Sequence, residues 1–305
     1  MISRIIVDRI HVPRIESFYH ESAPMNTDKK PVFSFEFFPP KTPDGKNNLR
    51  AASQRLAGLG PDFFSVTFGA GGSTQSGTLE TVREIRRETS IPTAPHISCI
   101  GSTRDKIREM LDSYRAAHIE RLVALRGDLL PGMKEPGELR YANELVEFIR
   151  EKTGDTFHIE VAAYPEVHPE APSAEVDRQN FKRKVEAGAD SAITQYFFDA
   201  DAYMDFVDNC RAIGVNIPII PGIMPITNYT SLAGFSQRCG AKIPPRLAER
   251  LEGFGDDLDS LRAFGIDTVT ELCRKLREAG APGLHFYVLN RAEPAITIWK
   301  NLGLS

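Results

Sequence analysis

Eight short apolar segments, separated by helical patterns, organise the chain from Pro31 onward. Most lack strict polar alternation, which is typical of strands buried on both faces of a parallel sheet. Alternating β and α segments predict right-handed crossovers, and eight such units fit a closed (β/α)8 TIM barrel, with a doubly wound α/β sheet as the alternative. The segments are 32–38, 63–68, 93–99, 121–126, 158–164, 191–198, 217–223 and 284–289.

The length of 305 residues suggests two domains at about 150 residues each, but one α/β barrel uses the same length. We expect a single barrel domain over residues 31–305, because no second core is evident. The seventh connection, about 228–282, is too long for one helix and predicts an extra helix near 244–253, between strands 7 and 8. Another helix, with Ile107, Met110 and Leu111 on its apolar face, is expected to begin at Ser102 or Thr103.

Residues 1–30 form an N-terminal extension without a clear pattern. Arginines at five-residue spacing resemble a transit peptide, but the acidic residues among them disfavour it. We interpret the segment as a surface arm, or as an overlong start with Met25 as the true first residue.

Composition excludes several classes of function. Lys and Arg number 37 against 41 Asp and Glu, so the net charge of −4 gives no basic field for nucleic acid. The four cysteines form no CxxC pair, which disfavours a zinc site or disulfide framework and favours a cytoplasmic protein. The sequence contains no run of 18 apolar residues, so no membrane partner is predicted. The HExxH motif of zinc proteases and the GxSxG motif of hydrolases are also missing, and no metal site is indicated.

Chemistry in a barrel belongs to the C-terminal ends of its strands. Glu36 stands among Phe35, Phe37 and Phe38 at the first of these ends, so we expect its pKa to be raised and the side chain to act as an acid or base. A salt bridge across the barrel mouth is the alternative.

The other strand ends carry weaker signals. The glycine-rich segment 69–72 follows Thr67, and it predicts either a loop whose backbone N–H groups bind phosphate or simply a flexible loop. His96 alone is typical of a core histidine. Arg126 and Asp128 stand on either side of Gly127, where they could bind a polar ligand or form a structural ion pair with each other. Further polar groups follow the fifth and sixth strands, namely Tyr164, Glu166, His168 and Gln195, and a helical polar stripe of Asp177, Asn180 and Lys184 is typical of a solvated face.

The sequences at these strand ends resemble the methylenetetrahydrofolate reductases, in particular the bacterial single-domain type. The resemblance covers about residues 31–303. The matching blocks are FSFEFFPPK at 33–41, SVTFGAGG at 65–72, APHISCIG at 94–101, VALRGDL at 123–129, VAAYPEVHPEA at 161–171, ITQYFFD at 193–199, PGIMPITNY at 221–229 and HFYVLNRAE at 285–293.

The resemblance implies an FAD-dependent enzyme that reduces 5,10-methylenetetrahydrofolate to 5-methyltetrahydrofolate with NADH or NADPH, by a ping-pong reaction. It implies Glu36 as the general acid and Asp128 as a charge that stabilises the folate cation. Flavin-contacting positions would be Thr67, His96, Arg126, Gly127, Asp128, Tyr141, Ala142, Tyr164, His168, Asp177, Asn180, Arg183 and Lys184. Folate positions would be Glu36, Asp128, Gln195, Tyr229, Tyr287 and Arg291, with Arg291 suited to the glutamate tail.

Two positions depart from the family pattern: Tyr229 replaces a usual Phe, and Leu130 replaces an expected Pro. We expect a homo-oligomer. The alternatives are a flavin-free reductase with direct hydride transfer and a folate-binding barrel without turnover.

Overall fold

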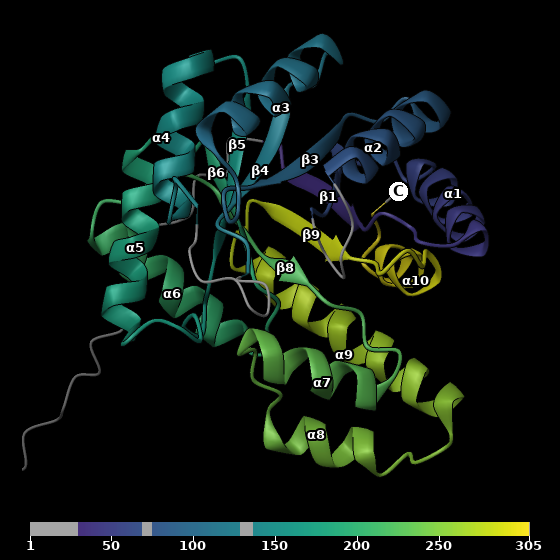
Figure 1. Cartoon of the computed structure of the whole chain (residues 1–305). Coiled ribbons are helices and arrows are strands. Elements are labelled where there is room, and N and C mark those ends of the chain that lie inside the picture. The colour runs from purple at the N-terminus through teal and green to yellow at the C-terminus, as the bar shows by residue number, and fades with distance from the viewer. Residues whose placement is uncertain (1–29, 69–74, 129–136, 305) are drawn as a thin grey trace, which may run out of the picture.

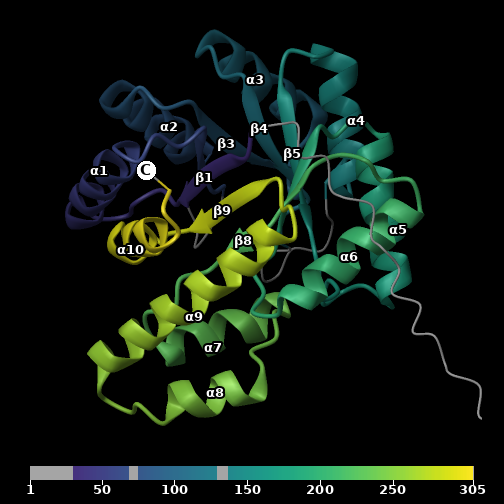
Figure 2. The same cartoon turned by 180° about the vertical axis from the view of Figure 1, so that it is seen from behind.

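The computed structural model describes residues 30–68, 75–128 and 137–304. Within them nine parallel strands form one nearly closed barrel, in the order β7-β6-β5-β4-β3-β2-β1-β9-β8 (Figures 1 and 2). The strands are β1 (Val32–Phe37), β2 (Phe63–Val66), β3 (Thr93–Ser98), β4 (Arg121–Leu125), β5 (His158–Ala163), β6 (Ser191–Thr194), β7 (Ile219–Ile220), β8 (Gly222–Ile223) and β9 (Gly283–Tyr287). The predicted TIM barrel is confirmed.

Helices cover the outside of the barrel (Figure 1). They are α1 (Pro43–Ala57), α2 (Gln75–Thr89), α3 (Arg104–Ala116), α4 (Ala142–Thr153), α5 (Ala174–Glu186), α6 (Ala200–Ala212), α7 (Tyr229–Cys239), α8 (Pro245–Glu252), α9 (Leu258–Glu278) and α10 (Glu293–Asn301). Helix α3 begins after Thr103, whose side chain accepts a hydrogen bond from the Lys106 N–H as an N-cap.

The strand predicted at 217–223 is shorter than expected and is divided. Pro221 separates β7, which pairs with β6, from β8, which pairs with β9. The following connection contains the expected helix, α8, and also α7, which the sequence pattern did not predict. The buried residues of this helix are Leu232 and Ser236, so its apolar stripe is weak.

Side chains of β1 alternate between the two faces of the barrel wall. Phe33 and Phe35 point outward and pack on Trp299 of α10, with ring centroids 5.0 and 5.8 Å away. Ser34 and Glu36 therefore point into the barrel. Below Glu36 the interior is filled by a small apolar cluster that contains Phe63, Ala94, Val123 and Ile193.

The first and last strands of the barrel meet at a parallel seam. Val32 pairs with Gly283, and Glu36 pairs with Tyr287. Gly283 has φ +154°, and a Cβ there would lie 1.8 Å from the Val32 carbonyl oxygen. Only glycine permits this close approach of the two strands.

None of the helices in the described ranges has the length and apolar character needed to cross a membrane. Most of the N-terminal extension (1–29), the glycine-rich loop at 69–74 and Leu130 lie outside the described residues.

Candidate active site at the barrel mouth

Glu36 meets two imidazoles at the C-terminal mouth of the barrel. Its Oε2 lies 3.3 Å from Nε2 of His96 on β3 and 3.4 Å from Nε2 of His285 on β9. Both histidines are buried, at 5% and 0% exposure, while the Glu36 side chain keeps 17% exposure. The carboxylate is therefore the member of this trio that faces the mouth.

The expected rise in the pKa of Glu36 is wrong. Burial alone would raise it, but the charge of His96 and the polar contacts of both imidazoles outweigh burial and lower the pKa of Glu36 to about 2. The neighbouring phenylalanines do not surround the carboxylate, because Phe35 and Phe37 lie on the opposite face of the strand, in the outer core. The alternative, a salt bridge across the mouth, stays a prediction, because the contacts of Glu36 with these histidines are ion pairs only when the imidazoles are protonated.

His285 is held in place by Ser34. The Ser34 Oγ lies 2.7 Å from Nδ1 of His285, and both side chains are fully buried. In a neutral ring, a hydroxyl that donates to Nδ1 leaves the proton on Nε2, which faces Glu36. Ser34, His285 and Glu36 thus form a chain along which a proton can be held.

Unpaired polar atoms surround this trio. Within the described residues, Ser65 Oγ and Thr67 Oγ1 are buried without a hydrogen-bond partner, and His96 Nε2 has only its 3.3 Å approach to Glu36. Buried polar atoms in a folded protein are almost always paired, so atoms left over at a strand end indicate a ligand site.

The polar stripe of α5 faces the mouth and not solvent alone. Lys184 Nζ donates to the Ala162 carbonyl at 2.5 Å, and burial lowers the pKa of Lys184 to about 8, against the nearby charge of Asp177. Asp177 accepts a hydrogen bond of 2.8 Å from the His168 N–H. The reading of this stripe as a solvated face is therefore wrong.

Tyr164 and His168 pack against each other beside that stripe, with ring centroids 4.5 Å apart. Burial and the charge of Asp128 raise the pKa of Tyr164 to about 12. Burial lowers the pKa of His168. Glu166 instead turns away to accept a hydrogen bond from the Lys242 N–H at 2.7 Å.

Arg126 pairs with Glu170 and not with Asp128. Its two terminal nitrogens lie 2.6 and 2.8 Å from the Glu170 oxygens, a bidentate pair that raises the pKa of Arg126. Asp128 is exposed at the end of β4. Between them Gly127 has φ +86°, and a Cβ there would meet Ser98 Oγ at 2.0 Å, so this close turn requires glycine.

The folate positions implied by the resemblance lie on two sides of the mouth. The Tyr287 hydroxyl donates a hydrogen bond of 2.7 Å to the Thr194 carbonyl. Gly222 lies against both groups, and a Cβ at this position would clash with the Thr194 carbonyl and with the Tyr287 ring. Gln195 follows β6, and its Oε1 accepts from the Tyr196 N–H at 3.0 Å. Tyr229 begins α7.

The remaining predicted positions lie farther out. Tyr141 is 57% exposed just before α4, which begins at Ala142. Arg183 is exposed and donates to Asn180 Oδ1 at 2.9 Å. Arg291 is exposed in the loop after β9. The structure brings Glu36, Thr67 and His96 close together at the strand ends, with these residues on the periphery.

A second cluster of charged groups fills the opposite, N-terminal end of the barrel. Glu160, fully buried, pairs with Arg121 and accepts a hydrogen bond from the Ser191 hydroxyl. His158 Nε2 lies 2.6 Å from Ser191 Oγ and 3.3 Å from Glu160. Burial would raise the pKa of Glu160, but the His158 contact and the Arg121 charge lower it. This is the floor cluster: Arg121, His158, Glu160 and Ser191.

Ser34 and His285 were missed as site residues. Ser34 is two positions before Glu36, and His285 is two positions before Tyr287, so the two-residue period of a strand places each pair on the same face. That period was the signal that could have identified Ser34 and His285. The pairing of β1 with β9, which joins the two faces, is not visible in either segment alone.

Comparisons with known proteins identify the family of this chain. Residues 21–303 match the family model described as methylenetetrahydrofolate reductase. The chain is 41% identical to 5,10-methylenetetrahydrofolate reductase of Escherichia coli strain K12 over 271 residues, covering 89% of this chain and 90% of that one.

A plant relative is longer. Methylenetetrahydrofolate reductase (NADH) 1 of Arabidopsis thaliana is 42% identical over 286 residues, and the match spans 90% of this chain but only 48% of the plant protein. The chain thus spans about half the length of that relative.

Among solved structures, a protein from Clostridium thermocellum that binds two copies of 5-methyl-5,6,7,8-tetrahydrofolic acid has a TM-score of 0.63 at 18% identity. It covers 90% of this chain and 96% of its own. At that identity the likeness supports the fold alone. The family model and the Escherichia coli relative together establish that this chain belongs to the methylenetetrahydrofolate reductase family.

Proposed function

We propose that this protein reduces 5,10-methylenetetrahydrofolate to 5-methyltetrahydrofolate, with NADH or NADPH as the donor, FAD as the resident cofactor and a ping-pong order. Family membership supports the reaction. The observation that carries it in this chain is Glu36 at the mouth, in contact with His96 and His285.

The residues present fit a flavin dinucleotide. Buried Thr67 Oγ1 has no hydrogen-bond partner within the described ranges, and the low pKa of Lys184 marks a cation that an anionic ligand would stabilise. Bound there, FAD would supply the hydride chemistry between the nicotinamide and the folate. The residues that would hold it are Thr67, His96, Arg126, Gly127, Asp128, Tyr141, Ala142, Tyr164, His168, Asp177, Asn180, Arg183 and Lys184.

The contribution of Glu36 is proton transfer to the folate. Opening the five-membered ring of the substrate breaks the bond between its bridging carbon and N10, which must gain a proton as it leaves. Because the low pKa keeps Glu36 ionised in the free site, its carboxylate must first take up a proton. We assign that proton to a protonated imidazole of His96 or His285, which becomes neutral as the Glu36 carboxyl passes the proton to N10. Ser34 keeps the His285 ring oriented for that transfer.

The cation that remains on the opened folate is stabilised by negative charge. Asp128, exposed at the end of β4 and not engaged by Arg126, is the residue we assign to this role. We assign Gln195, Tyr229, Tyr287 and Arg291 to folate binding.

Glu36→Gln tests the acid assignment. We expect the variant to lose folate reduction while reduction of its flavin by NADH or NADPH, followed anaerobically at the flavin absorbance, stays within about threefold of wild type. Full folate turnover in this variant would contradict the assignment.

Purified protein tests the cofactor. We expect a yellow preparation that releases FAD on denaturation. A colourless preparation that stays colourless with added FAD, yet reduces the folate, would instead support direct hydride transfer from the nicotinamide. Tight folate binding without any turnover would support the non-catalytic alternative.

A further inference from the structure

Ser65 is a polar residue inside the barrel to which the proposed reaction gives no role. It stands on β2 two positions after Phe63, which belongs to the interior apolar cluster, so its side chain faces the same interior. The residue is fully buried, at 0% exposure, and its Oγ has no hydrogen-bond partner in the described part of the chain. A buried hydroxyl is nearly always paired, and the cost of leaving this one unpaired indicates a role for it.

Ser65 lies one layer deeper than the ligand-facing surface of the mouth. Thr67, two residues farther along the same face of the chain, is half-buried and can meet a bound ligand, whereas no part of Ser65 is exposed. In the strand register the neighbour of Ser65 on β3 is Ala94, which has no polar side chain, and its neighbour on β1 is Glu36. The partner of the Ser65 hydroxyl therefore has to come from the protein, and the carboxyl of Glu36 lies beside it.

Glu36 has a carboxyl oxygen to which Ser65 can donate. The contacts of Glu36 with His96 and His285 are both made through Oε2, at 3.3 and 3.4 Å. Neighbouring strands lie about 4.8 Å apart, and paired residues project their side chains the same way, so Ser65 Oγ can turn toward Oε1 by rotation about its Cα–Cβ bond. His285 approaches Glu36 from β9, and Ser65 approaches it from β2, on the other side of β1.

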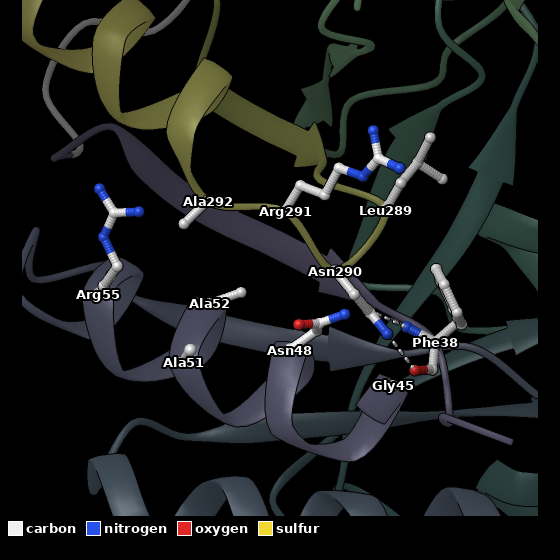
Figure 3. A pocket seen from close by; sticks show the side chains of 10 residues that line it. All are labelled: Phe38, Gly45, Asn48, Ala51, Ala52, Arg55, Leu289, Asn290, Arg291 and Ala292. Carbon is white, nitrogen blue, oxygen red and sulfur yellow. Dashed lines mark hydrogen bonds between the residues drawn. The ribbon is translucent and has the colours of Figure 1, made fainter. Parts of the chain in front are cut away.

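The backbone around Glu36 is fixed, so its carboxyl moves by side-chain rotation. Glu36 pairs with Ser65 on one side of β1 and with Tyr287 on the other. Just beyond the strand, the Asn290 side chain accepts from the Phe38 N–H at 3.0 Å and donates to the Phe38 carbonyl at 2.9 Å, as the dashed lines in Figure 3 show. The direction of the carboxyl is therefore set by the side chains that contact it.

We propose that Ser65 is a positioning residue for Glu36, and that its hydroxyl donates to the carboxyl as Glu36 gives up its proton. In that step the O–H bond of the carboxyl breaks, a bond between N10 of the folate and the proton forms, and a carboxylate remains. The imidazole that supplied the proton is then neutral, so the carboxylate has lost its cationic partner. This inference rests on the proposed function, because it needs a folate that accepts the proton.

The timing of this hydrogen bond is what makes it useful. The Ser65 hydroxyl is unpaired in the free site and becomes paired as charge develops on Glu36. An interaction that is stronger in the transition state than in the ground state accelerates a reaction, whereas one that is equally strong in both does not. Ser65 thus supports the acid without touching the substrate.

The two half-reactions of the holoenzyme, followed anaerobically at the flavin absorbance, test this role. We expect Ser65→Ala to slow reoxidation by 5,10-methylenetetrahydrofolate about tenfold, roughly the effect of one hydrogen bond to a charged group. Reduction by NADH or NADPH should stay within about twofold of wild type. Ser65→Thr, which keeps the hydroxyl, should restore most of the folate rate.

Thermal melts separate this role from a structural one. Because the hydroxyl is unpaired in the free protein, Ser65→Ala removes no hydrogen bond, and its melting temperature should not fall by more than about 2 °C. Thr270→Val is the matched control, because the Thr270 hydroxyl is also buried and unpaired but belongs to α9, outside the barrel. It should leave both half-reactions unchanged.

A double-mutant cycle shows whether Ser65 acts through Glu36. In the Glu36→Gln background no carboxylate forms, so Ser65→Ala should change the folate rate by less than about twofold. Equal folate rates for wild type and Ser65→Ala, or a tenfold loss that persists beside Glu36→Gln, would overturn the inference. A wild-type enzyme whose reduced flavin the folate does not reoxidise at all would instead overturn the proposed function, so the two failures are distinguishable.

Discussion

The two ends of the barrel interior hold nearly the same residue types in different states. The floor cluster contains a glutamate, a histidine, a serine and an arginine, and the mouth contains Glu36, two histidines and Ser34. At the floor, Glu160 is paired to Arg121 and to the Ser191 hydroxyl. At the mouth no permanent cation contacts Glu36 among the described residues, and the hydroxyls of Ser65 and Thr67 nearby lack hydrogen-bond partners.

This difference teaches how to separate structural from chemical charges. Both glutamates have a lowered pKa, so the direction of the shift does not distinguish them. What distinguishes them is the partner: an arginine never gives up its proton, whereas an imidazole exchanges one near neutral pH. The floor therefore stabilises the barrel, and the mouth is suited to proton transfer.

The largest expected effect breaks the comparison at the mouth. Glu36→Gln should reduce kcat for the folate by about 10²–10⁴-fold, the usual contribution of a general acid, because no carboxyl remains to pass on the proton. Steady-state rates measured beside a thermal melt check this. A fall in kcat no larger than the fraction of the variant that is unfolded at the assay temperature would indicate that Glu36 is mainly structural.

Glu160→Gln should have the opposite profile. Removing the carboxylate leaves Arg121 without its charge partner, so we expect the free energy of unfolding to fall by about 2–4 kcal/mol. The loss should be smaller than for a fully buried ion pair, because the Arg121 side chain is 26% exposed. Urea unfolding measures the loss. The specific activity of the folded protein should remain within about twofold, and a large fall in kcat would contradict a purely structural floor.

Lys184→Met sharpens the comparison beside the mouth. Because the pKa of Lys184 is about 8, an anionic flavin should raise it, so wild-type apoprotein should take up about half a proton on binding FAD near pH 8.5. Calorimetry in buffers of different ionisation enthalpy measures the uptake. The variant should take up none and bind about tenfold more weakly.

Lys182→Met is the control for that experiment, because Lys182 is on the same helix but pairs with Glu186. It should behave like wild type. Equal proton uptake in wild type and Lys184→Met would show that this ammonium does not respond to the flavin.

Stability in acid is a further test of Glu36. The pKa of Glu36 in the folded protein, about 2, is below the value of about 4.3 for an unfolded glutamate, so the folded state binds fewer protons between these values. The stability that the carboxylate confers is complete above about pH 5 and is lost as the pH falls toward 2. Unfolding free energies of wild type and Glu36→Gln should converge over that range, and parallel curves would contradict the lowered pKa.

The sequence predicted what depends on period and order along the chain. Strand positions and the barrel follow from buried β runs that alternate with helices, and the resemblance identified the strand-end residues. The pKa of Glu36 was mispredicted because Phe35 and Phe37 are neighbours in sequence but lie across the strand, while His96 and His285 are distant in sequence and adjacent in space. Likewise the Arg126–Glu170 pair spans two strand ends, and no local pattern indicates it.

The seam between β1 and β9 sets the order of events as the chain is made. Ser34 and His285 are 251 positions apart, so at roughly 5–20 residues per second the first strand waits about 12–50 s for its partner to leave the ribosome. Until then Glu36 has no His285, and any side chain in place of Gly283 would hold the two strands apart even afterwards. A chain that stops before β9 therefore lacks both the His285 contact of Glu36 and the strand that pairs with β1 and β8.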